Sequence, residues 1–200
     1  MNKTRREAFS DGVIAIIITI MVLELRPPHG ADWAAMRPLI PSFLTYLLSF
    51  IFLGIYWNNH HHMLQATQRI NGATLWANLH LLFWLSLIPF VTNWMGENHY
   101  EAVPTALYGI VLLGCAIAYT ILLRTILSAQ RGVNSHLAAA IGDDRKGKFS
   151  LLLYAMSIPL AFVHQTISHV IYVVVALIWL VPDPRIESRL QETAGREPAA

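Results

Sequence analysis

The sequence predicts an all-α integral membrane protein that crosses the bilayer six times. Of its 200 residues, 55% are hydrophobic and 13% are charged, about half the charged fraction of a typical soluble domain. Apolar runs long enough for a helix to cross the roughly 30 Å hydrocarbon core recur along the chain. The lysines and arginines gather mainly in alternate connections between these runs, as expected for a protein that spans a membrane several times.

We place the spans, in order, at about 7–25, 39–62, 73–95, 103–127, 148–164 and 166–182. The first has a basic start like a secretory signal, but no small-residue cleavage site follows and Phe9-Ser10-Asp11 interrupts its apolar run, which disfavours a signal peptide. Pro89 and Pro159 fall within the third and fifth spans, and each should kink its helix. Residues 164–169 alone separate the last two spans, which form either a tight hairpin or one long bent segment.

The basic residues orient the spans. They concentrate at the amino end, in the connection after the fourth span and in the tail, which places these segments in the cytoplasm. The residues concerned are Lys3, Arg5, Arg6, Arg131, Arg145, Lys146, Lys148, Arg185, Arg189 and Arg196. Arg26 and Arg37 run against this pattern, although Arg26 borders a helix end and can extend to the interface. We expect one six-helix domain over residues 1–182 in the cell membrane, with both termini cytoplasmic, and a cytoplasmic tail over 183–200 that ends in disorder.

Several functional classes find no support. The net charge of +2 is too small and too scattered to indicate nucleic-acid binding. The chain has no Walker A motif, Rossmann glycine pattern or nucleophile elbow. Its single cysteine, Cys115, has no disulfide partner. Adjacent helical residues diverge by about 100°, so His60-His61-His62 cannot all hold one metal ion. We expect no cofactor and no resident metal.

Polar motifs occur in the first three spans. The first span carries Arg5-x-x-x-Phe9-Ser10-Asp11, followed by Ala15-Ile16, Thr19 and Leu23-Glu24; Trp57-x-x-His60-His61 lies on the second, and Asn78 with Ser86-Leu87-Ile88-Pro89-Phe90 on the third. Over about the first 95 residues this pattern resembles the transmembrane-protein-175 family in its bacterial and archaeal single-repeat form. The later spans match that family only in number and hydropathy.

The resemblance implies a homotetrameric, potassium-permeable cation channel whose first helix lines the pore without a re-entrant filter loop. The chain also lacks a Thr-Val-Gly-Tyr-Gly filter segment. Helix geometry gathers Ile16, Thr19, Ile20 and Leu23 into one stripe with Gly12. From periodicity alone, lipid-facing or bundle packing is the simpler explanation of this stripe. The resemblance instead assigns the pore constriction to Ile16, Ile20 and Leu23, and a contribution to selectivity to Thr19.

A second group of residues is expected to tie the first three helices together, because a buried polar or charged group needs partners. Its members are Arg5, Ser10, Asp11, Trp57, His60, His61 and Asn78. Neutral His60 or His61 can hydrogen-bond the Asp11 carboxylate, and protonation of either would add charge at mildly acidic pH.

The expected partners are potassium ions, the lipid bilayer and further copies of the chain. The alternative function is a proton-coupled or other secondary transporter, which would normally place ionisable groups at the membrane midplane. Asp11 and Glu24 instead lie at the two ends of the first span. An enzyme is not expected, because no paired carboxylates or ligand-spaced histidines converge at one depth.

Overall fold

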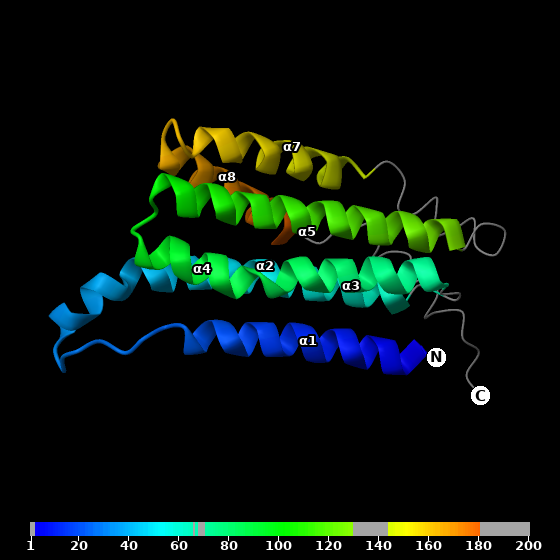
Figure 1. The fold of residues 1–200 in the computed structure, drawn as a ribbon, viewed down its shortest axis with the longest axis horizontal. Coiled ribbons are helices and arrows are strands. Elements are labelled where there is room, and N and C mark those ends of the chain that lie inside the picture. Colours follow the sequence, from blue (N-terminus) through cyan, green and yellow to red (C-terminus); the bar gives the residue numbers. More distant parts are fainter. Residues whose placement is uncertain (1–2, 66, 68–70, 130–143, 181–200) are drawn as a thin grey trace.

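The structure, a computed structural model, describes residues 3–65, 67, 71–129 and 144–180. In these residues the chain forms an elongated bundle of helices (Figure 1). Successive helices run in opposite directions, except that α4 continues the direction of α3. Helix α1 lies along one side of this bundle, and α7 lies along the opposite side. The all-helical architecture predicted from the sequence is confirmed for the described part of the chain.

Helices occupy all six of the ranges predicted as spans. They are α1 (Lys3–Leu23), α2 (Ile40–Gln65), α3 (Gly72–Ser86), α4 (Ile88–Glu97), α5 (Ala102–Ala129), α7 (Arg145–Leu160) and α8 (Gln165–Leu180), with a short 3₁₀ helix, η1 (Trp33–Leu39), before α2. The third predicted span therefore consists of two helices, α3 and α4. The last two spans form a hairpin rather than one bent segment, because a turn separates α7 from α8. The predicted tail over 183–200 lies outside the described residues.

The break between α3 and α4 lies at Leu87, two residues before Pro89. Proline has no backbone N–H to donate and its ring crowds the preceding turn, so it interrupts a helix when it lies in the interior. Proline is tolerated in the first turn of a helix, so α4 can begin just before Pro89. The third predicted span is thus interrupted just before this proline. Pro159 lies within α7, which ends one residue later, at Leu160.

Within the described residues, three helical stretches are long and apolar enough to cross a membrane: Trp33–Gln65, Gly72–Glu97 and Ala102–Ala129. Helices α1, α7 and α8 do not meet this criterion, because of charge in α1 and of length in α7 and α8. The first half of α1 carries charged residues. Helices α7 and α8 have 16 residues each, or roughly 24 Å of helix, which is shorter than a hydrocarbon core of about 30 Å. The count of six spans therefore remains a prediction.

Helix α5 forms the centre of the bundle and packs against α3, α4, α7 and α8. Leu112, Cys115 and Leu122 on this helix are completely buried. Gly114 allows α3 to approach closely, since a Cβ atom there would lie 2.3 Å from the indole ring of Trp84. Helix α1 lies at one side of the bundle, and one of its faces joins this core by packing against α2, α3 and α4. The described residues leave its opposite face uncovered.

Candidate functional site

The two faces of α1 differ sharply in burial. Ile14, Ile17 and Met21 are at most 4% exposed and pack toward the other helices. By contrast, Ile16 is 59% exposed and Leu23 79% exposed. The stripe predicted from helix geometry is therefore the face that α1 does not use for packing within its own subunit.

All members of that stripe lie on this uncovered face. Ile20 and Thr19 are exposed, and a Cβ atom added at Gly12 would meet nothing within 4 Å. The Thr19 hydroxyl donates a hydrogen bond to the backbone oxygen of Ile16 at 2.9 Å. Because its single proton is used within the helix, the lone pairs of the hydroxyl oxygen remain available to a cation.

A chain of hydrogen bonds joins α1 to α3 and α2. The Asn78 amide nitrogen donates to the Ser10 hydroxyl at 3.0 Å, and the Asn78 amide oxygen lies 2.6 Å from Nε2 of His60. Since that oxygen can only accept, His60 Nε2 must carry the proton. Ser10 and His60 are buried. Three of the residues expected in the polar network therefore form one continuous interhelical contact.

A second bond holds the next residue of α1. The Trp57 indole nitrogen donates to the Asp11 carboxylate at 3.0 Å, and the indole stacks on the His61 ring with centroids 5.8 Å apart. His61 Nε2 lies 2.9 Å from the Gln65 side chain. Among the described residues, neither His60 nor His61 hydrogen-bonds Asp11, so the histidine–carboxylate bond considered above does not form.

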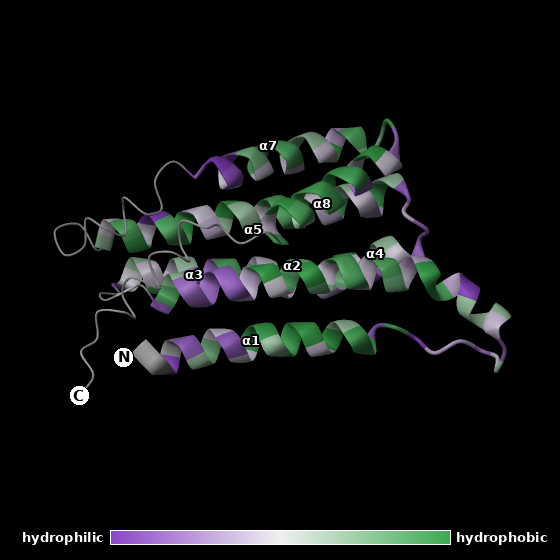
Figure 2. Ribbon diagram, turned by 180° about the vertical axis from the view of Figure 1, so that it is seen from behind, coloured by the Kyte–Doolittle hydropathy of each residue, from purple (hydrophilic) through white to green (hydrophobic). Residues whose placement is uncertain are grey.

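Arg5 is the one member of the expected network that the structure does not bring into it. Its side chain is exposed, and no ion pair joins it to Asp11 in the described part of the chain. The half-buried carboxylate instead receives its hydrogen bond from the indole of Trp57. Figure 2 shows that the hydrophilic residues of α1 lie in the half near the N-terminus, whereas the other half is mainly hydrophobic.

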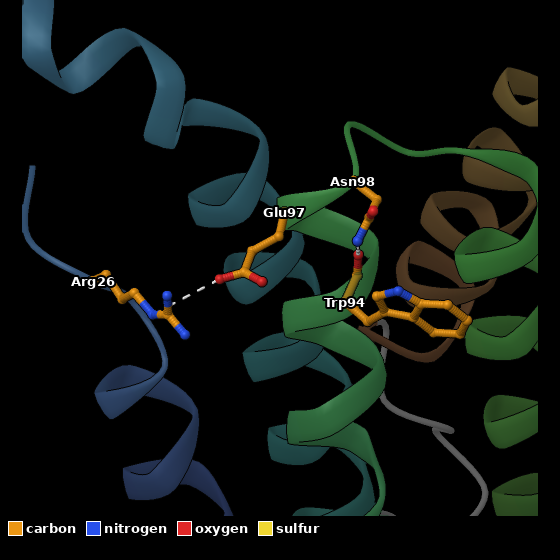
Figure 3. A network of polar contacts seen from close by, with 4 residues as sticks. All are labelled: Arg26, Trp94, Glu97 and Asn98. Carbon is orange, nitrogen blue, oxygen red and sulfur yellow. Dashed lines mark hydrogen bonds and ion pairs between the residues drawn. The ribbon is translucent and has the colours of Figure 1, made fainter.

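At the far end of α1, a groove of about 600 Å³ separates this helix from α4. Its lining includes two stripe residues from α1, two aromatic residues from α4 and two carboxylates, namely Ile16, Ile20, Phe90, Trp94, Glu24 and Glu97. On the outer side, Arg26 Nε lies 3.9 Å from the Glu97 carboxylate (Figure 3). This groove connects the uncovered face of α1 with a negatively charged edge of the bundle.

The α4 part of this groove was not anticipated from the sequence. Phe90 belongs to the motif on the third span, but no role follows from that motif. A useful signal was present: Phe90 and Trp94 are separated by four residues, which places them on one face of a helix. No group of three His, Cys, Asp or Glu side chains suited to a metal ion occurs within the described residues.

Comparison with known proteins gives consistent likenesses. Residues 5–89 match the family model described as endosomal/lysosomal potassium channel TMEM175. A protein of Chryseobacterium sp. (strain P1-3) named as a potassium channel is 54% identical over 192 residues, which cover 96% of this chain and 100% of that protein. Another so named, from Streptomyces collinus, is 30% identical over 94% of this chain and 98% of its own length.

A solved structure extends this likeness to the fold. It is described as the crystal structure of a lysosomal potassium-selective channel TMEM175 homolog from Chamaesiphon minutus. The two chains share 29% sequence identity and superpose with a TM-score of 0.79, over 90% of this chain and 96% of that one. The likeness therefore includes the helices beyond residue 95, where motifs gave no guidance.

Proposed function

Because this chain belongs to the TMEM175 family, we propose that it is a potassium channel whose pore is lined by the first helix of each of four subunits. The observation that carries this proposal is the uncovered face of α1. Ile16, Ile20 and Leu23 are exposed there, although the opposite face of the same helix is buried and hydrogen-bonded to α2 and α3. A helix that is fixed by its buried face and exposes its other face is suited to form the wall of a pore.

The number of four subunits in this proposal comes from the resemblance to the family, and the geometry of α1 supports an assembly of several copies. One copy of α1 cannot surround an ion path, and the described residues of its own subunit leave its stripe uncovered. Four copies around an axis would enclose a narrow tube, with Gly12 allowing close approach of the helices near one end. The surrounding α2 to α8 bundle would then face the lipid.

Each residue of the stripe has a distinct role in this proposal. Rings of Ile16, Ile20 and Leu23 form apolar constrictions, and such a neck can lose its water and so block ions. Thr19 supplies a ring of hydroxyl oxygens between the Ile16 and Ile20 levels. Its proton is already donated to Ile16, so the ring presents oxygen lone pairs to a potassium ion and contributes to selectivity.

The polar network serves to hold α1 in this position. Ser10 and Asp11 are bonded to different helices, which fixes the rotation of α1 about its axis. We place the protein in the cell membrane with both termini in the cytoplasm, in agreement with the positions of its basic residues.

The alternative is a proton-coupled or other secondary transporter. Such carriers place ionisable groups near the membrane midplane, whereas Asp11 and Glu24 lie at opposite ends of the first span. The family and the relatives named above are described as channels rather than enzymes. A channel is therefore the function that the site supports best.

The test uses the purified protein in liposomes with potassium as the sole ion gradient. A channel should pass potassium down this gradient and set a membrane voltage, whereas a proton-coupled carrier should move protons together with the potassium and change the internal pH. Single cysteines at positions 16 and 152, each in a Cys115→Ala background, test the assembly. The residue at 16 should cross-link between subunits, and the exposed Leu152 position on α7 should not. Cross-linking only at 152 would refute the pore assignment.

A further inference from the structure

The groove between α1 and α4 is large enough to take a small organic molecule. Its volume of about 600 Å³ lies within the range of roughly 300–1,000 Å³ typical of small-molecule sites. Ile16 and Ile20 form one wall, and both are also members of the proposed pore stripe. A molecule in this groove would therefore contact the residues that limit ion passage.

The opposite wall is aromatic. Phe90 and Trp94 lie one helical turn apart on α4, with ring centroids 6.1 Å apart and planes inclined by 25°. Phe90 is 62% exposed and lines the groove, so part of its ring is accessible to a molecule bound there. Aromatic faces attract cations, and quaternary ammonium groups in particular, because the ring quadrupole is negative over the face.

The charged residues of the groove also favour a cationic ligand. Glu24 and Glu97 both line the groove, and none of its described lining residues is Lys, Arg or His. Arg26 lies outside the lining and contacts Glu97 at 3.9 Å (Figure 3). That contact is loose and exposed, so Glu97 is only partly neutralised. The groove thus combines an apolar body, an aromatic wall and an excess of negative charge.

From this complementarity we propose that the α1–α4 groove binds a hydrophobic ammonium ion. The apolar part of the ligand lies against Ile16 and Ile20, and its cationic head lies between Phe90 and the carboxylates of Glu24 and Glu97. Arg26 opposes binding, because it competes for Glu97. The inhibition expected from such a ligand rests on the proposed function, since Ile16 and Ile20 are also assigned to the pore.

The first experiment measures binding of benzyltrimethylammonium to the purified protein by isothermal titration calorimetry at low ionic strength. Glu24→Gln and Glu97→Gln should each weaken binding about fivefold to tenfold, as expected for loss of one partly screened charge. Phe90→Leu keeps an apolar side chain but removes the ring, and should weaken binding about twofold to fivefold. Arg26→Gln should strengthen binding about threefold, because it releases Glu97.

Two controls isolate the contribution of the groove. Glu101→Gln removes an exposed carboxylate that is not part of the lining, and should leave the affinity unchanged. Benzenesulfonate, an aromatic anion, should not bind. The proposal is overturned if the wild-type protein shows no saturable binding, as it would if a neighbouring subunit covers the groove. It is also overturned if Arg26→Gln weakens binding or if all the variants bind equally.

Potassium flux separates this inference from the proposed function. Benzyltrimethylammonium at saturating concentration should reduce flux through the wild-type protein in liposomes, and less so through Phe90→Leu at the same concentration. A wild-type protein that conducts no potassium would refute the proposed function, while the binding titration still decides the groove. Conduction that is unaffected by the bound ion would refute the shared role of Ile16 and Ile20.

Discussion

Replacing Asn78 with leucine should destabilise the protein by stranding a histidine in its interior. Asn78 is the middle member of the chain from Ser10 to His60. In the wild type, Nε2 of His60 is bonded to Asn78, and Nδ1 is buried without a hydrogen-bond partner. Asn78→Leu therefore leaves both nitrogens of a buried imidazole unpaired. The Ser10 hydroxyl suffers less, since a helical serine can donate to its own backbone.

The magnitude follows from these contacts. A buried polar group left without its partner costs about 1–3 kcal/mol, so Asn78→Leu should lose about 2 kcal/mol. For a chain of this length, that loss corresponds to roughly 4–8 °C in the unfolding midpoint. Replacing both partners with apolar groups of similar shape can be nearly neutral. The double variant Asn78→Leu/His60→Phe should therefore recover most of the loss.

The assay is the temperature at which half of the protein leaves the monodisperse peak in size-exclusion chromatography. Asn98→Ala is the matched control, because Asn98 is exposed and bonds only a neighbouring carbonyl, that of Trp94 (Figure 3). It should shift the midpoint by no more than about 1–2 °C. If Asn78→Leu behaves like Asn98→Ala, or if the two substitutions at 78 and 60 destabilise additively, the network does not hold α1 as described.

Four further substitutions test the pore stripe, the network and the core. Ile16→Asn places a polar ring in the proposed neck and should raise potassium flux in liposomes several-fold, and unchanged flux would contradict the constriction. Thr19→Val keeps the side-chain shape but removes the hydroxyl, and should bring the potassium and sodium reversal potentials closer together; identical selectivity would exclude Thr19. Asp11→Ala should lower the yield of assembled protein before it alters selectivity, because Asp11 is bonded to a neighbouring helix. A well-assembled variant with altered selectivity would instead place this carboxylate in the pore. Gly114→Ala should cost about 1–3 kcal/mol, since its Cβ meets the Trp84 ring at 2.3 Å, and a wild-type unfolding midpoint would show that the ring can move aside.

The helices themselves could be predicted because hydropathy and length determine them. Each predicted span contains a helix, and the break before Pro89 follows from the chemistry of proline. The uncovered stripe on α1 could also be predicted, because a helical repeat of 3.6 residues places Ile16, Ile20 and Leu23 on one face. What periodicity cannot decide is whether such a face meets lipid, another helix or water. The structure shows that Ile14 and Ile17 on the opposite side are buried against the other helices, which leaves the stripe uncovered among the described residues.

Partners within the polar network were harder to predict than its members. Ser10, Asp11, Trp57, His60 and Asn78 were all expected in it, yet the sequence pointed to a histidine–carboxylate bond, and the structure instead pairs His60 with Asn78. Several of these side chains could hydrogen-bond one another chemically, so the exact positions of the three helices decide which pairs form. A shift of one residue turns a side chain by about 100°, so depth along the helix does not determine which of several suitable groups comes within 3 Å.

The adjacency of Ser10 and Asp11 explains how a network at one end of α1 can position a stripe farther along. Neighbouring residues point about 100° apart, and here one bonds α3 and the other bonds α2. One such bond would let the helix pivot about the contact, but two in different directions leave no free rotation. Ile16 lies five residues beyond Asp11, little more than one turn along a continuous helix. A rotation large enough to exchange Ile16 for the buried Ile17 would break both bonds, so the polar residues determine which apolar face of α1 remains open.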